Sequence, residues 1–438
     1  MAQHLRAAGI ELRPNPSQLV ALRLPTTFVE QLSTPDTVFA DIRLVPLGRK
    51  LVLTARGPRE VTVAPLNEAL DYRFALKRFL DTWTVRLRTL LRDDQVRLTA
   101  DLSGGIDSRA VFALTASAAA ATPLDTVVQL VSGQSVAQRA DFAVAEQIAA
   151  RYGATVNRPL APLDVVPYSA KESYEGWRDL CLGLYLPIYL PKVRLASWSV
   201  NLSGLGGEGH RPFYPQKDAD DFVHGFSSDG PPEMIAGWRE DISRLLKRWE
   251  REDDSIHPLV RHYREFRGRF HGGLFAQTKV NVTPLSSWLM DSAVRHAGSG
   301  RRVMFDVMES SLPGVMDLQY DMPGKAPSND DRSRVTRVPV DAADEFGAVY
   351  ASTAPQPTPE SGGPSAFEIL ARDFETCLTP DVRDLLGVKI AQEASDVVQS
   401  AVNSHSFGHA RRASNVARVM SAAMVLSPAA LPDTDRAG

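Results

Sequence analysis

The stretch LTADLSGGIDSRAVFALTASAAA, residues 98–120, constrains the fold more than any other part of this chain. Alternating apolar residues predict a strand over 97–102, and the Ala-rich run predicts a helix over about 107–120. A small polar turn, S-G-G-I-D-S, separates the two. In parallel α/β folds, ligands bind where the carboxyl end of a strand leads into the amino end of a helix. The turn is therefore the first candidate site.

Strands and helices alternate around this turn. Before it, FALKRFLDTWTVRLRTLLRDD places Trp83 and several leucines on one helical face. After it, TVVQLVSG predicts a second strand, RADFAVAEQIAARYG predicts a helix ending at Gly153, and ATVNRPL is a candidate third strand. This alternation predicts an α/β fold, a parallel sheet with helices on both faces.

The flanking regions differ in character. Residues 1–70 look β-rich, with short apolar runs on either side of a turn at Pro46–Gly48, as in a hairpin. Residues 230–325 read as mostly helical, and the tail carries further helical patterns. Segments 326–337 and 353–365 are polar or rich in Pro, Gly and Ser, and we expect them to be mobile. We expect two parts, 1–70 and 71–438.

Composition excludes several classes of protein. The net charge of −3 gives no whole-chain attraction to nucleic acid or to an anionic membrane. The two cysteines, Cys181 and Cys377, provide neither a disulfide framework nor a four-ligand zinc site, which favours a cytoplasmic location. There is no signal-peptide pattern and no apolar run of about 18 residues. We therefore expect no nucleic-acid and no membrane partner.

The residues of the turn suit a phosphate ligand. Gly104 and Gly105 let backbone N–H groups approach an anion without a β-carbon in the way. Ser103 and Ser108 add hydroxyl donors. Asp107 is a poor partner for phosphate by itself, but a good ligand for Mg²⁺ that bridges phosphate oxygens. The turn therefore predicts a site for pyrophosphate and Mg²⁺. The Walker pattern, another phosphate-binding loop, is absent from the sequence.

Two motifs carry a family resemblance. S-G-G-x-D-S resembles the loop of the N-type ATP pyrophosphatases. NLSGLGGEGHRPFY, residues 201–214, resembles the asparagine synthetase motif S-G-E-G-x-D-E-x-F-G-G-Y. Glu208 falls where that motif has a metal-binding Asp, whereas Leu205 and Gly209 stand where the motif has acids. The positions that match by type and spacing are Ser203, Gly204, Gly206 and Tyr214.

The resemblance implies that ATP is cut between its α- and β-phosphates and that a substrate carboxylate becomes an acyl-adenylate. It implies a role for each matching position. Asp107 and Glu208 would hold magnesium. Tyr214 would orient the nucleophile or relay its proton, and Lys325 would meet pyrophosphate and the acyl-adenylate. The pyrophosphate would be held by Ser103, Gly104, Gly105 and Ser108, and the adenosine pocket would be shaped by Ser203, Gly204 and the strand around Leu130 and Ser132.

The amino-terminal region departs from that family. Asparagine synthetases begin with a glutaminase domain whose nucleophile is a Cys directly after the initiator Met. Here that position is Ala2, and no Cys precedes Cys181. FADIRLVPLGRKLVL still resembles the last strands of that domain. We therefore expect residues 1–70 to be an inactive remnant, because glutamine hydrolysis would lack its nucleophile.

The expected function is an ATP-dependent, AMP-forming carbon–nitrogen ligase without glutaminase activity. It would join a small-molecule or peptide carboxylate to an amine or ammonia. β-Lactam synthetases and lasso-peptide macrolactam cyclases are similar to it, which suggests natural-product biosynthesis by analogy. Two alternatives stay open: another N-type ATP pyrophosphatase, and a non-catalytic nucleotide-binding scaffold. A homodimer and a partner biosynthetic protein are also left open.

Overall fold

The computed structural model of the chain describes most of its length. The described residues are Leu5, 8–63, 71–120, 122–160, 165–196, 198–227, 229–341, 363–408 and 410–427.

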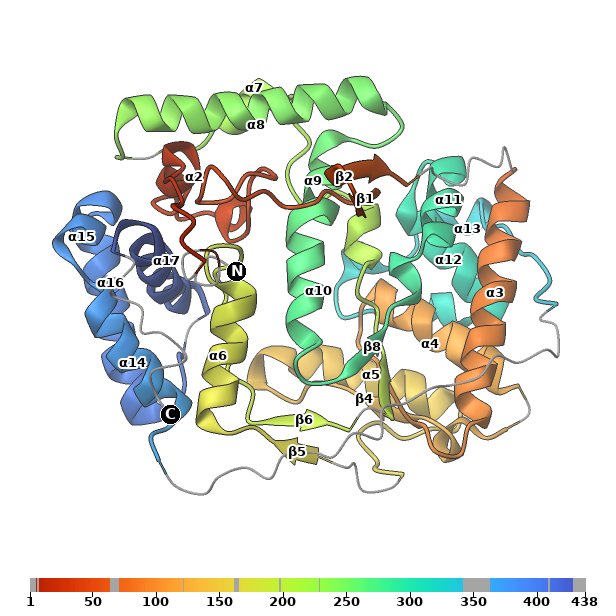
Figure 1. Cartoon of the computed structure of the whole chain (residues 1–438). Coiled ribbons are helices and arrows are strands. Elements are labelled where there is room, and N and C mark those ends of the chain that lie inside the picture. Colours follow the sequence, from red (N-terminus) through yellow and green to blue (C-terminus); the bar gives the residue numbers. More distant parts are fainter. Residues whose placement is uncertain are drawn as a thin grey trace.

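The chain is mainly helical, with short strands (Figure 1). The helices are α2 (Pro16–Ala21), α3 (Tyr72–Arg92), α4 (Ile106–Ala119), α5 (Arg139–Arg151), α6 (Ala170–Cys181), α7 (Ala219–His224), α8 (Pro232–Glu252), α9 (Pro258–Tyr263), α10 (Arg269–Phe275), α11 (Trp288–Ala297), α12 (Gly300–Ser311), α13 (Asn329–Ser333), α14 (Ala366–Cys377), α15 (Pro380–Leu386), α16 (Val388–Ser404) and α17 (Ala410–Leu426). The strands are β1 (Arg49–Thr54), β2 (Gly57–Thr62), β3 (Arg97–Asp101), β4 (Gln129–Val131), β5 (Val165–Pro167), β6 (Val193–Leu195), β7 (Ser199–Leu202) and β8 (Val280–Val282).

The central sheet has four parallel strands in the order β4-β3-β7-β8. Its helical surroundings confirm the predicted α/β class, a parallel sheet flanked by helices (Figure 1). Strands β3 and β4 lie where the sequence predicts them. The stretch ATVNRPL forms only an isolated bridge between Val156 and Leu130. The outer strand β8 lies in a region that reads as helical, because three residues are too few to show a period of two.

The largest hydrophobic core explains why the predicted helices form. Leu98, Ala100 and Leu102 alternate on β3, and all three are buried in that core. Helix α4 is buried on almost every side, which its Ala-rich sequence permits. Helix α3 begins at Asp71, whose side chain accepts the N–H of Phe74 at 2.9 Å. Good capping and a long apolar face thus place α3 beside α4 and α11.

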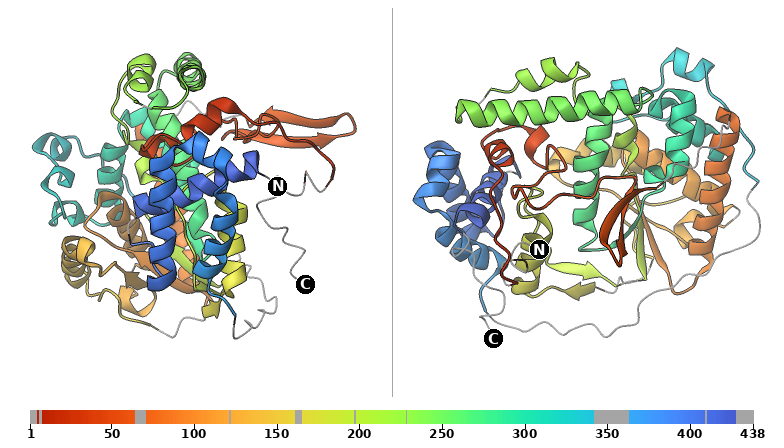
Figure 2. Two further views of the ribbon diagram at one scale, coloured as in Figure 1. Left: turned by 90° about the vertical axis from the view of Figure 1, so that its left-hand side faces the viewer. Right: turned by 45° about the horizontal axis from the view of Figure 1, so that its top comes forward.

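The amino-terminal region differs from its prediction. In the described part of residues 1–70, the only two strands that pair over several residues are β1 and β2. The turn of this hairpin lies at residues 55 and 56 rather than at Pro46–Gly48. Gly57, with φ of +103°, makes this turn sterically accessible. Before the hairpin, helix α2 and residues up to Phe39 pack into two smaller hydrophobic cores, against α8 and α17 among others. Figure 2 shows the hairpin projecting from the body of the molecule.

The structure describes the two segments expected to be mobile to different extents, and their mobility stays a prediction. Segment 326–337 contains α13, which begins with a capping box at Ser328 and Asp331. Arg332 also pairs with Asp317 at 2.8 Å, so local capping and an ion pair give this polar stretch a defined structure. In segment 353–365, residues 353–362 lie outside the described residues, and Ser365 caps α14.

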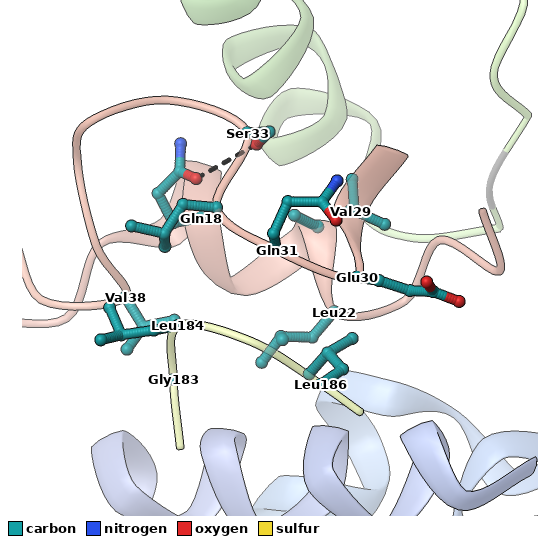
Figure 3. Close-up of a pocket in the computed structure, with 12 residues that line it drawn as sticks. Gln18, Leu22, Val29, Glu30, Gln31, Ser33, Val38, Gly183, Leu184 and Leu186 are labelled. Atoms are coloured by element: carbon teal, nitrogen blue, oxygen red, sulfur yellow. Dashed lines mark hydrogen bonds between the residues drawn. The ribbon is translucent and has the colours of Figure 1, made fainter. Parts of the chain in front are cut away.

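A small cavity lies beneath the amino-terminal region (Figure 3). Its volume is about 20 Å³, and its polar lining includes Gln18, whose side-chain oxygen accepts the hydroxyl of Ser33 at 3.3 Å. Among the described residues, the buried Nε2 of Gln18 has no hydrogen-bond partner. This space suits one water molecule rather than a substrate. Within the described residues, no helix is both long enough and apolar enough to cross a membrane.

Candidate active site

The two glycine-rich loops meet at the carboxyl edge of the sheet. The first loop follows β3 and leads into α4; the second follows β7. A β-carbon added to Gly204 would lie 2.7 Å from the backbone nitrogen of Ser108 and 3.0 Å from the Cβ of Asp107. Only glycine permits this approach, because real β-carbons do not come so close. The tertiary structure thus joins the two motifs into one site.

The first loop is held by its own side chains. The hydroxyls of Ser103 and Ser108 are 2.8 Å apart, and Ser108 Oγ accepts the N–H of Ser103 at 3.1 Å. The N–H of Gly105 donates to Ser103 Oγ at 3.1 Å. The N–H of Gly104 donates to a carboxylate oxygen of Asp141 at 3.1 Å. Helix α4 then begins at Gly105 without a side-chain cap. The first N–H groups of the helix therefore have no side-chain cap and can bind an anion.

Lys325 reaches the first loop through a buried arginine. Arg109, which is fully buried on α4, donates to the carbonyls of Leu318 at 2.8 Å and Gln319 at 2.5 Å. This anchors the segment that follows, and the N–H of Asp321 donates to the Gly104 carbonyl at 3.4 Å. Lys325 Nζ then lies 2.6 Å from Asp321 Oδ2. The lysine is therefore close to the loop, as the resemblance implies.

Asp107 and Glu208 face one another across the two loops. Burial raises the pKa of Glu208, and the nearby Asp107 carboxylate raises it further. Asp107 is also bound by Arg211, whose Nη1 and Nη2 each lie 2.6 Å from one carboxylate oxygen. Two carboxylates and one guanidinium thus form a compact charged cluster.

A cavity of about 250 Å³ opens beside Glu208. Tyr263 lines it, and its hydroxyl has no hydrogen-bond partner among the described residues. Burial raises the pKa of Tyr263 to about 12, and Glu208 adds to this. Arg264 lines it too, pairing with Asp291 at 3.0 Å and with His210 Nδ1 at 2.8 Å. Leu47 from the amino-terminal region completes one wall.

A π-helical turn at Arg264–Gly268, between α9 and α10, supports this cavity. Its side chains reach three separate segments. Arg264 donates to the Gly209 carbonyl, Glu265 accepts the N–H of Leu47 at 2.8 Å, and Arg267 pairs with Glu30 at 2.8 Å. The side chains of Arg264 and Arg267 are therefore mostly buried, and they hold these segments together. Insertions of this kind in helices are frequent at functional sites.

Other residues from the sequence prediction lie further from the charged cluster. Tyr214 is 6% exposed within an aromatic core, and its hydroxyl accepts Gln31 Nε2 at 3.2 Å. The structure does not bring it to the loops, and its catalytic role stays a prediction. Leu130 is buried in the main core, so only its backbone can serve a ligand. Ser132 directly follows β4, and Asn157 binds both its N–H and its carbonyl at 3.0 Å.

Sequence reasoning missed several residues of the site. Arg211 and Tyr263 carry no motif of their own, and Asp141 lies on α5, far from either loop in sequence. Only Arg211 had an available signal, because it lies inside the second motif, at the position where that motif has Phe.

The residues present fit a magnesium–nucleotide ligand. The Asp141 carboxylate already accepts a hydrogen bond from the N–H of Gly104, at the position where a phosphate oxygen would bind. Asp107 and Glu208 offer hard oxygen donors from two sides. Within the described residues, no group of three or more acidic, His or Cys side chains gathers as a metal site. Phosphate oxygens and water would therefore have to complete the shell.

Comparison with known proteins places this geometry in a family. The model of the asparagine synthase family matches residues 82–305. That range includes all four strands of the central sheet and both glycine-rich loops, and it ends before Lys325. Among curated proteins, no sequence matches the chain. Because the matched region covers more than half of the sequence, the chain belongs to the asparagine synthase family.

Proposed function

We propose that the chain activates a substrate carboxylate with ATP, releasing pyrophosphate, and transfers the acyl group to an amine or ammonia. Membership of the asparagine synthase family makes an ATP-dependent amide-forming ligase the general class. The formation of AMP, the absence of glutaminase activity and a role in natural-product assembly are the finer parts of the proposal. The observation that supports it most is the contact of the two loops at Gly204, which brings Asp107 and Glu208 together beside a cavity.

Each side chain has a task in this proposal. The N–H groups of the first loop and the hydroxyls of Ser103 and Ser108 bind the phosphates. Lys325 neutralises charge on the leaving pyrophosphate. Asp107 and Glu208 would hold Mg²⁺, which supplies charge neutralisation for the phosphates when bound. Tyr263 would donate a hydrogen bond to the substrate in the cavity beside Glu208.

The state of the two cysteines supports the absence of glutaminase activity. Cys181 and Cys377 are both buried, and burial raises the pKa of each thiol to about 12. A buried neutral thiol is a poor nucleophile. The pure protein should therefore release no glutamate from glutamine, while ammonium or a primary amine should serve as acceptor.

Product analysis tests the reaction. Purified protein is incubated with Mg·ATP, ammonium, and a set of amino acids and short peptides as carboxylate donors. We expect AMP and pyrophosphate, and ADP as the stoichiometric product would contradict the proposal. Asp107→Asn should lower turnover by about 10²-fold or more because a charged ligand is lost. Asp125→Asn is the matched control, since Asp125 pairs with Arg158 at 3.2 Å, outside both loops.

One observation favours the second candidate, a non-catalytic nucleotide-binding scaffold. Both oxygens of Asp107 are engaged by Arg211, so the metal ligand is not free. A scaffold would bind nucleotide without consuming it. Nucleotide binding by calorimetry, combined with no AMP from any donor, would favour the scaffold over the ligase.

A further inference from the structure

The contact between Arg211 and Asp107 has the geometry of a strong ion pair. Two parallel N–H···O bonds of 2.6 Å join the guanidinium to the carboxylate. Bidentate pairs of this kind are stronger and more directional than single contacts. Arg211 directly follows a short 3-10 turn, Gly207–His210, which also carries Glu208. One loop therefore supplies both a carboxylate and the cation that neutralises its neighbour.

The charges around this pair are unbalanced. The charged side chains that act on Glu208 are Asp107, which raises its pKa, and Arg211, which lowers it. The single positive charge of Arg211 therefore faces the two negative charges of Asp107 and Glu208. A divalent cation between the carboxylates would remove their repulsion, but each oxygen of Asp107 already accepts a hydrogen bond from Arg211, which would place the guanidinium charge directly beside the ion. Because the two positive charges repel one another, a metal ion and Arg211 compete for the same carboxylate.

We propose that Arg211 is a positioning residue that holds Asp107 while the metal is absent and releases it when a divalent cation binds, so that Arg211 sets the metal requirement of the protein. This rests on the proposed function only in taking Asp107 and Glu208 as metal ligands. An arginine does not lose its proton in proteins, so the exchange occurs by movement of the side chain. The side chain of Arg211 is 36% exposed, which leaves room for that movement.

The competition has a measurable consequence. The apparent affinity for the metal equals the intrinsic affinity multiplied by the fraction of molecules in which Asp107 is free. Removing Arg211 raises that fraction to one and restores the full affinity. Arg211→Gln should therefore bind Mn²⁺, used as the probe, about tenfold more tightly than the wild type if Asp107 is free in about a tenth of the molecules. Arg211→Lys keeps the charge but loses the bidentate geometry, so it should lie between the two.

The experiment is a Mn²⁺ titration of the full chain without nucleotide, followed by the electron paramagnetic resonance signal of the free ion. Asp107→Asn should lose binding, which confirms where the ion sits. Arg244→Gln is the matched control, because Arg244 forms an exposed ion pair with Glu240 on α8. Melting in EDTA gives a second readout. Arg211→Gln should melt about 2–4 °C below the wild type, and Mn²⁺ should remove the difference.

The outcomes separate this inference from the proposed function. Equal or weaker Mn²⁺ binding by Arg211→Gln overturns it, and so does a site that binds no Mn²⁺ in any variant. If Arg211→Gln fails to fold, the intermediate affinity expected of Arg211→Lys decides the matter. Formation of ADP by the wild type would overturn the proposed reaction, while the Mn²⁺ competition would still stand on its own measurement.

Discussion

The backbone N–H of Asp321 donates to the carbonyl of Gly104 at 3.4 Å, although more than two hundred residues separate them. This contact brings Lys325 to the first loop, because Lys325 pairs with Asp321 one helical turn later. The geometry depends on the absence of a side chain at position 104. A β-carbon there would lie 2.5 Å from the Cβ of Asp321 and 2.9 Å from its backbone nitrogen.

Gly104→Ala should therefore disturb both stability and activity. The backbone of Asp321 cannot move away cheaply, so we expect a loss of about 1–3 kcal/mol in unfolding free energy, as in overpacked cores. ATP turnover should fall as Lys325 moves. The measurements are chemical denaturation and AMP formation. Gly272→Ala is the control, since an added β-carbon there meets nothing within 4 Å. A fully stable and active Gly104→Ala would show that the contact with Asp321 is dispensable.

Glu208 should be the second metal carboxylate. Glu208→Gln should raise the magnesium requirement and cut AMP formation by about 10²-fold, because a charged oxygen ligand is lost. Glu208→Asp should be tolerated better, since it keeps the charge. The measurement is pyrophosphate release at several magnesium concentrations. Glu252→Gln, on the exposed end of α8, is the control. If Glu208→Gln matches the wild type throughout, Glu208 is only a turn residue.

Tyr214 and Tyr263 should differ when each loses its hydroxyl. Tyr214 is bonded to Gln31 in an aromatic core, so Tyr214→Phe should cost about 1 kcal/mol of stability and change turnover by less than about threefold. Tyr263→Phe should instead weaken substrate binding, because Tyr263 lines the cavity beside Glu208. The measurements are denaturation and KM for the carboxylate. A loss of about 10²-fold in kcat for Tyr214→Phe at unchanged stability would support a catalytic Tyr214.

His262 should make the protein sensitive to acid. It is fully buried, stacks on Phe28 and binds the Ser33 carbonyl at 3.0 Å, and burial lowers its pKa to about 3. The unfolded chain takes up a proton near pH 6.5, whereas the folded chain does not. This contribution to stability is therefore complete above pH 6.5 and is lost, at about 1.4 kcal/mol per pH unit, as the pH falls towards 3.

The test compares unfolding free energies between pH 7 and pH 4. His262→Gln should show a shallower loss than the wild type, whatever its stability at pH 7. His224→Gln, at the exposed end of α7, should keep the wild-type slope. Identical slopes for His262→Gln and the wild type would mean that His262 titrates normally in the folded state.

The sequence by itself determined the central strands β3 and β4, the helices α3, α4 and α5, and the two glycine-rich motifs. These features are local: a period of two or of 3.6 residues, a cap or a glycine turn records them in neighbouring positions. A motif resemblance also predicted Lys325 as a site residue, and its role stays a prediction. The sequence could not place β8, which is three residues long, or the turn of the hairpin, because several turn-like stretches compete there.

Only the tertiary structure decided how the site is assembled. Arg109 anchors the segment that carries Lys325, Arg211 occupies Asp107, and Tyr263 and Leu47 form walls of the cavity. None of these contacts leaves a periodic trace in the sequence, since each joins residues from separate elements. Likewise, Tyr214 matches the second motif but lies in a hydrophobic core. The burial of its ring depends on which side chains pack against it, and the motif does not record them.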